Sequence, residues 1–256
     1  MKSNLWVFVV DIHYPTYDKP TARALFDFLK RNKVSGFIFG GDQHNNDGIS
    51  HHNKSKPLFR EKAAFRRETE GFEREILTPV EKLLPRDAKR VWILGNHERF
   101  CDDVGEQQPE LAGALDRVEL YHLRDRGFEI VELGHAYKHR KLTFMHGEWI
   151  SGGVNPSKKL AEIVAANVVA GHTHSPQSYT RISPVSQRDK WMSWISPILG
   201  TCNPAYIRNR PTSWVNGFCL IEFHPNGNFN CYPVVVSNGQ FAWGGEIFGT
   251  RTRKAA

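Results

Sequence analysis

The first half of the chain alternates between short apolar runs and longer amphipathic stretches. The run LWVFVV is rich in β-branched and aromatic residues, which is typical of a strand buried on both faces. Strands alternating with helices predict an α/β fold that begins with a parallel sheet. The strands are expected at 5–10, 37–39 and 91–94, and the helices at 21–30 and 58–84, the second interrupted near Pro79.

The second half is richer in strand patterns. The sequence PNGN at 225–228 predicts a hairpin turn within the apolar stretch 218–236. We expect a single domain over 1–256, with a polar loop and helical segment (43–84) near the functional site and a β-rich C-terminal part (190–250). Further strands are predicted at 128–133, 141–145 and 167–170, and a helix at 160–166.

Composition is typical of a soluble globular protein, with 40% hydrophobic and 24% charged residues. The apolar runs are too short to cross a bilayer, and the start of the chain does not resemble a secretory signal, so we expect a cytoplasmic protein without a membrane partner. The four cysteines show no paired spacing, which favours reduced thiols. The net charge of +7 favours anionic partners such as nucleotides, DNA or RNA.

Polar side chains follow five of the predicted apolar runs, at the point where each run ends. Parallel α/β sheets place ligand sites at the carboxyl ends of their strands, so these side chains are expected to meet at one edge. They are Asp11 and His13, Asp42, Asn96 with His97 and Glu98, His146, and His172 with His174.

Carboxylate, amide and imidazole donors without a thiolate suit Mn²⁺, Fe, Zn²⁺ or Ni²⁺. They are too many for one ion and about right for two that share a carboxylate. Two such ions can stabilise both oxygens of a phosphoryl displacement. For the sequence GHTH, strand geometry alone would point His172 and His174 at the same ion.

The ordered motifs D-x-H, GD, GNHE, HG and GHTH, between 11 and 174, resemble the calcineurin-like metallophosphoesterase superfamily. The resemblance implies a four-layer αββα sandwich of two mixed β-sheets flanked by helices. It also implies two divalent ions, Mn²⁺ being the first expectation, with a bridging hydroxide as nucleophile. The implied ligands are Asp11, His13 and His174 for the first ion, Asn96, His146 and His172 for the second, and Asp42 between them.

Two residues of the GNHE motif are implied to be catalytic. His97 is similar to the histidine that contacts the substrate phosphate and, as an imidazolium, protonates the leaving group. Glu98 is similar to the acidic residue that orients this histidine. An acidic residue that begins a helix and is stabilised by the helix dipole is the alternative for Glu98.

The motifs that bind substrate in better-known members of the superfamily differ in this chain. Protein Ser/Thr phosphatases of the superfamily carry GDxxDRG and RGNHE, whereas this chain has GDQHNND and LGNHE. DNA-repair nucleases of the superfamily carry a histidine three residues after the aspartate of the GD motif. This chain has Asn45 at that position, and its nearest histidine, His44, comes one residue earlier. Together with Arg99, these two residues are candidates for substrate binding.

We therefore expect a phosphodiesterase acting on a nucleotide or a nucleic acid. A phosphomonoesterase or protein phosphatase of the same superfamily, and a nucleic-acid-binding scaffold with secondary activity, are the alternatives. Four tryptophans in the second half offer rings that bases can stack on, although the odd spacing in WMSW predicts that one of its rings packs inward as core. They are Trp191, Trp194, Trp214 and Trp243.

Overall fold

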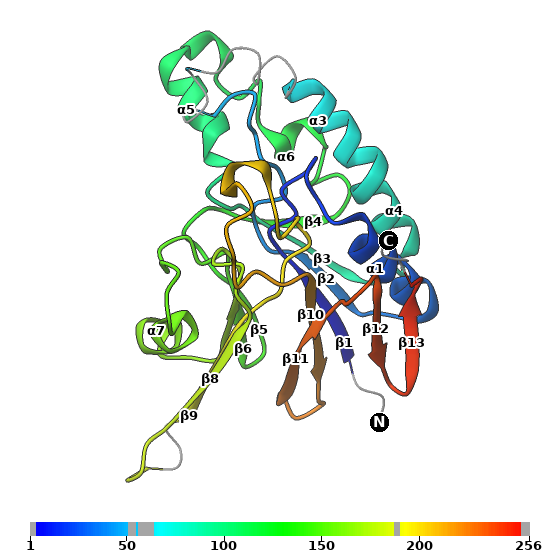
Figure 1. The fold of residues 1–256 in the computed structure, drawn as a ribbon, viewed down its shortest axis with the longest axis vertical. Helices are drawn as coiled ribbons and strands as arrows, with labels where there is room; N and C mark the ends of the chain where they lie inside the picture. The colour runs from blue at the N-terminus through cyan, green and yellow to red at the C-terminus, as the bar shows by residue number, and fades with distance from the viewer. Residues whose placement is uncertain (1–3, 51–54, 56–63, 187–189, 252–256) are drawn as a thin grey trace.

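The computed structural model describes residues 4–50, 55, 64–186 and 190–251. Its larger sheet has six strands, and four of them, the run from β1 to β4 at one side of the sheet, are parallel, as the strand–helix alternation predicted (Figure 1). In spatial order they are β11 (Phe229–Val235), β10 (Gly217–Phe223), β1 (Asn4–Val9), β2 (Gly36–Phe39), β3 (Lys89–Ile93) and β4 (Phe128–Val131). The PNGN turn joins β10 to β11, which confirms the predicted hairpin.

The second sheet has five strands and is also mixed. β6, β7 and β9 run parallel to their neighbours in this set, whereas β5 and β8 are antiparallel edge strands. In spatial order they are β5 (Tyr137–His139), β6 (Leu142–Phe144), β7 (Val168–Ala170), β9 (Lys190–Ile195) and β8 (Gln177–Ile182). The carboxyl ends of β6 and β7 therefore add a second group of strand ends to those of β1, β2 and β3.

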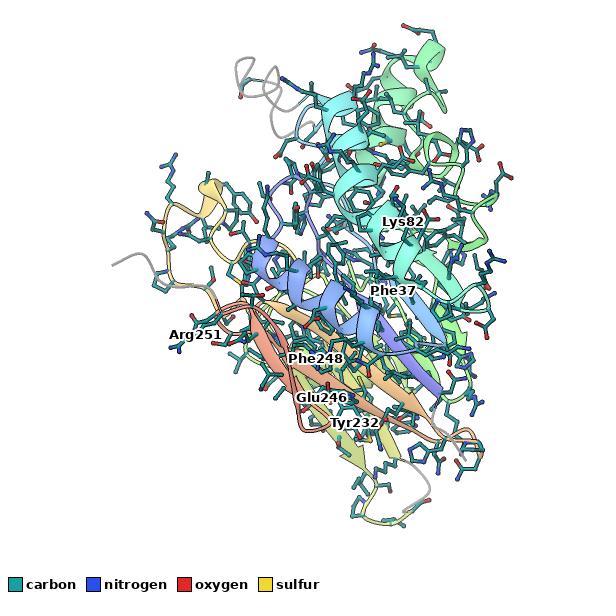
Figure 2. The ribbon with its side chains drawn as sticks, turned by 90° about the vertical axis from the view of Figure 1, so that its right-hand side faces the viewer. Phe37, Lys82, Tyr232, Glu246, Phe248 and Arg251 are labelled. Atoms are coloured by element: carbon teal, nitrogen blue, oxygen red, sulfur yellow. The ribbon has the colours of Figure 1, made fainter. Side chains whose placement is uncertain are left out.

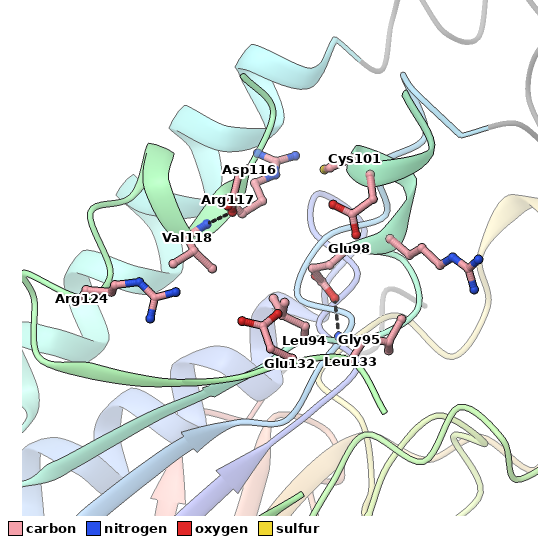
Figure 3. A pocket seen from close by; sticks show the side chains of 12 residues that line it. Leu94, Gly95, Glu98, Cys101, Asp116, Arg117, Val118, Arg124, Glu132 and Leu133 are labelled. Atoms are coloured by element: carbon pink, nitrogen blue, oxygen red, sulfur yellow. Dashed lines mark hydrogen bonds between the residues drawn. The ribbon is translucent and has the colours of Figure 1, made fainter. Parts of the chain in front are cut away.

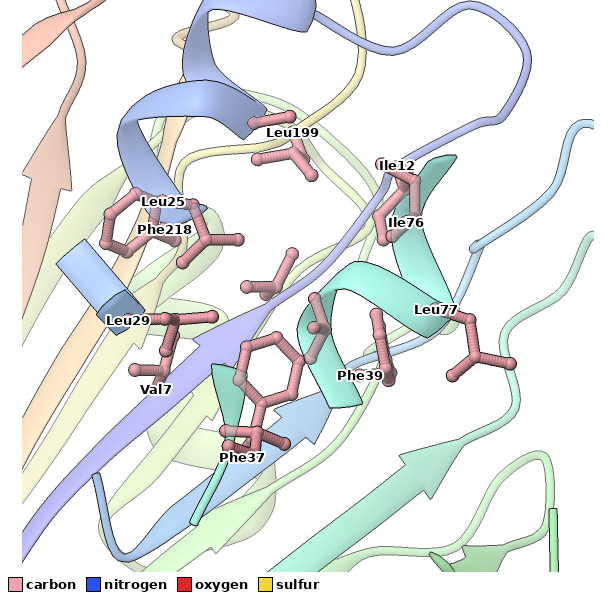
Figure 4. Close-up of a cluster of buried hydrophobic side chains, with 14 of the residues drawn as sticks. Val7, Ile12, Leu25, Leu29, Phe37, Phe39, Ile76, Leu77, Leu199 and Phe218 are labelled. Atoms are coloured by element: carbon pink, nitrogen blue, oxygen red, sulfur yellow. The ribbon is translucent and has the colours of Figure 1, made fainter. Parts of the chain in front are cut away.

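Three apolar clusters define the layers of the fold. The largest packs α1 (Lys19–Arg31) and the helical stretch that ends in α4 (Thr78–Leu83) against one face of the first sheet (Figure 4). The hairpin of β12 (Gln240–Trp243) and β13 (Glu246–Gly249) adds Phe241 and Phe248 to this cluster. A second cluster, which includes Phe8 and Phe144, fills the space between the two sheets. A third packs Leu160 of α7 (Pro156–Val164) against the outer face of the second sheet. Helix, sheet, sheet and helix confirm the expected αββα arrangement.

The first helix shows how local sequence sets an element's bounds. α1 (Lys19–Arg31) begins where the Asp18 carboxylate accepts a hydrogen bond from the backbone of Thr21. Its buried face repeats at helical spacing and includes Leu25, Phe28 and Leu29. The hairpin of β12 (Gln240–Trp243) and β13 (Glu246–Gly249) covers this helix, with Phe248 packed on Phe28 (Figure 2).

The predicted break near Pro79 is wrong. From residue 65 onward the helix is continuous through α3 (Phe65–Phe72), a π-helical segment (Glu73–Leu77) and α4 (Thr78–Leu83). Pro79 lies in the first turn of α4, where the wider π-helical turn before it accommodates a residue that has no N–H to donate. Residues 58–63 of the predicted helix lie outside the described part of the chain.

A smaller helical group lies at the carboxyl end of the first sheet. It comprises α5 (Arg99–Gln107), a 3₁₀ turn (Pro109–Leu111) and α6 (Arg117–Leu120), and it packs beside α3 (Figure 1). A further 3₁₀ turn (Ala205–Ile207) interrupts the long connection from β9 to β10. Among the described helices, none is long and apolar enough to span a membrane.

Candidate metal centre

The loops that follow β1, β2, β3, β6 and β7 meet where the two sheets face each other. Backbone hydrogen bonds join them directly: Asp11 donates to Gly41, His13 donates to Asp42, and Gly171 donates to His146. The structure thereby brings together the polar residues that end five separate strands. Their side chains form two adjacent groups, and the Asp42 carboxylate of the second also lies within 4.0 Å of His13 in the first. A third group overlaps both and joins His13 and Asp42 to His97.

The first group consists of Asp11, His13 and His174. The Nε2 atoms of His13 and His174 lie 3.1 Å apart, and His174 Nε2 lies 3.5 Å from Asp11 Oδ1. Asp11 is held by its other oxygen, which accepts a hydrogen bond from the backbone of His172 at 2.8 Å. No described residue hydrogen-bonds to Asp11 Oδ1, so this buried oxygen is free to bind a cation.

The second group consists of Asp42, His146 and His172, with Asn96 beside it. His146 Nδ1 donates to the Gly40 carbonyl at 3.1 Å, so in the neutral tautomer its Nε2 carries the lone pair. That atom lies 3.3 Å from Asp42 Oδ2 and 3.0 Å from Asn96 Oδ1. Three acceptor atoms that face one another require a proton or a cation among them.

The electrostatics of His146 lead to the same requirement. Burial alone would lower the pKa of this imidazole, but the Asp42 carboxylate outweighs burial and raises the pKa to about 10. Asp42 Oδ2 also lies 4.0 Å from His13 Nε2, so its carboxylate reaches both groups. The donor set of carboxylates, imidazoles and an amide fits a pair of divalent ions.

The backbone is strained at the same residues. Five of the seven expected ligands adopt a positive φ, which is uncommon outside glycine and costs on the order of 1–3 kcal/mol each. They are Asp11 (52°), His13 (51°), Asp42 (52°), His172 (65°) and His174 (60°). Gly95 adds a steric requirement, because a Cβ atom there would overlap the Asp42 carboxylate. Several strained backbone conformations close together are typical of a functional site.

His97 lies at the edge of the cluster, with its side chain 27% exposed. Its ring Nδ1 donates to the Asn45 carbonyl at 2.9 Å, which leaves Nε2 free, 3.9 Å from Asp42 Oδ2. Burial lowers the pKa of His97, but the Asp42 carboxylate and the bond to Asn45 outweigh burial, so the pKa lies above its ordinary value. The Asp42 carboxylate therefore stabilises the protonated form of this ring.

Glu98 does not make the contact that the resemblance implied. Its carboxylate accepts hydrogen bonds from the backbone N–H groups of Asp42 and Gly95 on one oxygen, and of Gln43 on the other. The Asn45 carbonyl, not Glu98, orients the His97 ring. This corrects the expectation: Glu98 holds the loop that carries Asp42. Three N–H groups at the start of that loop, and that of Gly95 after β3, converge on its carboxylate, which as an anion is a strong acceptor.

The three expected substrate contacts have different surroundings. His44 is fully buried and its Nε2 donates to the Tyr121 hydroxyl, so it is not accessible to a substrate. Asn45 is partly exposed and contributes its carbonyl to His97. Arg99 begins α5, pairs with Asp103 at 3.7 Å, and lies beside Glu98 rather than among the candidate ligands. The polar loop expected near the site is described only in part, because 51–54 and 56–63 lie outside the described residues.

Sequence reasoning missed two features near the cluster. Tyr206 and Trp214 stand beside it, with the Trp214 ring centroid 4.3 Å from that of His174; Trp214 was noted only as one of four tryptophans. A buried arginine, Arg117, reaches the loop next to His97 through Asn46. Neither Tyr206 nor Arg117 lies in a motif, so no local signal marked them.

Comparison with known proteins identifies the family. Vacuolar Protein Sorting 29 from Cryptosporidium parvum is similar over 97% of this chain and 99% of its own, with 12% identity and a TM-score of 0.49. A metallophosphoesterase from Sphaerobacter thermophilus is similar over 89% of this chain and 88% of its own, with 14% identity and a TM-score of 0.42. No curated protein sequence gives a significant match. The family model for calcineurin-like phosphoesterases matches residues 7–193, well over half of the 256 residues, and the chain therefore belongs to that family, as its motifs predicted.

Proposed function

We propose that this protein is a phosphodiesterase that uses two divalent ions, with Mn²⁺ as the first expectation, and acts on a nucleotide or nucleic-acid substrate. The observation that carries the proposal is the pair of ligand groups that share the Asp42 carboxylate. When bound, the two ions supply stabilisation of charge on the phosphoryl oxygens and make the attacking water acidic at neutral pH. The cytoplasmic location stays a prediction.

The chain's own residues divide the work of binding and proton transfer. Asp11, His13 and His174 would hold one ion, and Asn96, His146 and His172 would hold the other. His97 is the proton donor to the leaving group: its Nδ1 is fixed by Asn45, and its partly exposed Nε2 is free. Glu98 acts indirectly, by holding the loop that presents Asp42.

Two aromatic side chains beside the ligand groups, Tyr206 and Trp214, support a substrate that contains a nucleoside. Tyr206 is 67% exposed, and its ring lies 6.3 Å from that of Trp214, which in turn contacts His174. Burial and the carboxylates of Asp47, Asp11 and Asp42 raise the pKa of Tyr206, which places the tyrosine in the electrostatic field of the site. An exposed ring beside a phosphoester site provides a stacking surface for a base. The net charge of +7 favours the same polyanionic class of substrate.

Substrate choice can be tested with esters that share one leaving group. With Mn²⁺ present, we expect turnover of methyl p-nitrophenyl phosphate to exceed that of p-nitrophenyl phosphate. We expect the p-nitrophenyl ester of thymidine 5′-phosphate to have a lower KM than the methyl ester. Asp42→Asn serves as the inactive control. Faster turnover of the monoester would contradict the diester assignment, and binding of DNA without turnover would support a scaffold instead.

The stacking role of Tyr206 has its own test. Stacking of one base is worth about 1–3 kcal/mol, so Tyr206→Ala should raise the KM of the thymidine ester by about 5–150-fold. The methyl ester has no base, and its KM should not change. Tyr206→Phe keeps the ring and should behave like the wild type. Equal KM changes for both esters would mean that the tyrosine shapes the site without binding a base.

A further inference from the structure

A buried polar unit lies directly behind the His97 turn. It consists of Asn46 in the loop after β2, Glu68 of α3 and Arg117 of α6, and all three side chains are buried. None of them belongs to the ligand groups of the metal centre. Three separate segments of the chain are thus joined through polar side chains at one place.

Asn46 is the centre of this unit. Its backbone N–H donates to Glu68 Oε1 at 2.9 Å, and its side-chain oxygen accepts from Arg117 Nη2 at 2.7 Å. Its side-chain Nδ2 donates to the backbone carbonyl of His97 at 2.8 Å. The residue also adopts a positive φ of 54°, so these hydrogen bonds hold a backbone conformation that is otherwise unfavourable.

The same short loop therefore fixes His97 at two points. Asn45 accepts the ring Nδ1 proton, and the neighbouring Asn46 holds the backbone carbonyl. A shift of this loop would move both contacts together and re-aim the free Nε2. Misplacement of a reacting group by about 1 Å can cost about 100-fold in rate.

Arg117 is the rigid support for Asn46. Its guanidinium also donates to the Thr69 hydroxyl, lies 3.6 Å from Glu68 Oε1, and stacks over the Phe65 ring at 3.8 Å. All of these partners belong to α3. A buried ion pair contributes little net stability compared with apolar residues of the same size. The fixed geometry of the guanidinium is the property that apolar residues would not reproduce.

A cavity of about 100 Å³ borders the unit on the side of Glu98 and Cys101 (Figure 3). Its described lining includes Arg117 and Glu98 but none of the expected metal ligands. Close packing on this side is therefore incomplete, and hydrogen bonds carry the positioning of the loop. The cavity also gives room for a substituted side chain at 117.

We propose that Arg117, acting through Asn46, is a positioning residue for His97, which makes proton donation to the leaving group depend on a side chain outside the motifs. This rests on the proposed function, since His97 must act as the proton donor. A poor leaving group needs the proton, whereas p-nitrophenolate departs without one. Loss of positioning should therefore slow only esters with poor leaving groups.

Two variants and one control test this role. Asn46→Asp keeps the oxygen that accepts from Arg117 and loses the donor to His97. Arg117→Met removes the support altogether. Arg126→Met is the matched control, because Arg126 pairs with Glu73 and Glu81 on the same long helix but does not reach Asn46. Each is compared, with Mn²⁺ saturating and after a melting curve confirms folding, on methyl p-nitrophenyl phosphate and methyl phenyl phosphate.

General acid catalysis accelerates a reaction about 10²–10⁴-fold. The fall in kcat of His97→Asn on the phenyl ester therefore measures the complete loss of the proton donor. Asn46→Asp and Arg117→Met should lower kcat about tenfold or more on the phenyl ester and less than about threefold on the nitrophenyl ester, with KM unchanged. Equal losses of kcat on both esters would overturn this inference but leave the proposed function standing. So would a larger loss on the phenyl ester than on the nitrophenyl ester in Arg126→Met. No wild-type turnover of either diester would instead remove the proposed function, and the inference with it.

Discussion

Glu98 should be essential to the stability of the site loop, and Glu98→Gln tests this directly. One oxygen of the carboxylate accepts hydrogen bonds from the backbone N–H groups of Asp42 (3.0 Å) and Gly95 (2.8 Å). The other accepts from those of Gln43 (3.0 Å) and His44 (3.4 Å). Glutamine replaces one oxygen by an NH₂ group, so two buried N–H donors lose their acceptor. At about 1–3 kcal/mol for each unsatisfied group, the expected loss is about 2–6 kcal/mol in the free energy of unfolding.

The assay is urea unfolding at pH 8. Burial and the Asp42 carboxylate raise the pKa of Glu98 from 4.5 to about 7, so at pH 8 the wild type carries the carboxylate that the variant lacks. That raised pKa costs the wild type about 3 kcal/mol at pH 8, which the neutral glutamine avoids, so the net loss of stability in Glu98→Gln is smaller than the hydrogen-bond loss alone. Glu70→Gln is the control, since Glu70 is 57% exposed and its ion pair with Arg66 is on the surface. Mn²⁺ affinity, measured by calorimetry, should fall about 10–100-fold in Glu98→Gln. Unchanged Mn²⁺ affinity in a folded Glu98→Gln variant would refute the reasoning, because the loop that presents Asp42 would then not depend on the carboxylate.

Three further changes have defined outcomes. Asp42→Asn should lower Mn²⁺ affinity in calorimetry at least about tenfold, because this carboxylate reaches both ligand groups; wild-type affinity would contradict the shared site. Burial raises the pKa of Glu68 to about 7 from an ordinary value of 4.5, so the folded protein holds a proton that the unfolded chain releases. Wild-type unfolding free energy should therefore fall by about 3 kcal/mol as the pH rises from 4.5 through 7, and urea curves of Glu68→Gln should lack that component. Phe248→Ala should cost about 3–5 kcal/mol in urea unfolding, whereas Ile247→Ala, at a side chain that is 56% exposed, should stay within about 0.5 kcal/mol; equal losses would mean that the hairpin does not bury Phe248 against α1.

The sequence predicted the sheet edge well because the signal is local. Five of the apolar runs end in polar residues, and parallel strands bring their carboxyl ends to one edge of the sheet regardless of how the loops are arranged. The odd spacing of Trp191 and Trp194 was equally informative: Trp194 is buried between the sheets, and Trp191 is only partly buried beneath Arg181. Alternation along a strand is a geometric property that needs no knowledge of partners.

Partners distant in sequence could not be predicted in this way. Asn46 and Arg117 are 71 residues apart, and no periodicity relates a loop residue to an arginine on a short helix. Glu98 was placed correctly at its strand end, but its contacts depend on how two loops meet, so the resemblance implied the wrong partner. The packing of elements decides such contacts, and sequence pattern decides only the elements.

The four residues of the GHTH sequence show how tertiary structure changes what the local pattern predicts. On a regular strand, His172 and His174 would point the same way. The strand ends at Ala170, however, and the backbone N–H of Thr173 donates to the Gly171 carbonyl in a tight turn. Both histidines adopt positive φ values in that turn, so their rings diverge: His172 faces His146 and Asp42, and His174 faces His13 and Asp11. Because Asp11 also accepts the His172 N–H, one carboxylate fixes the turn from which both imidazoles project. Replacing Gly171 would crowd Asp11 and Val10, so the separation of the two ligand groups depends on this glycine as much as on the histidines.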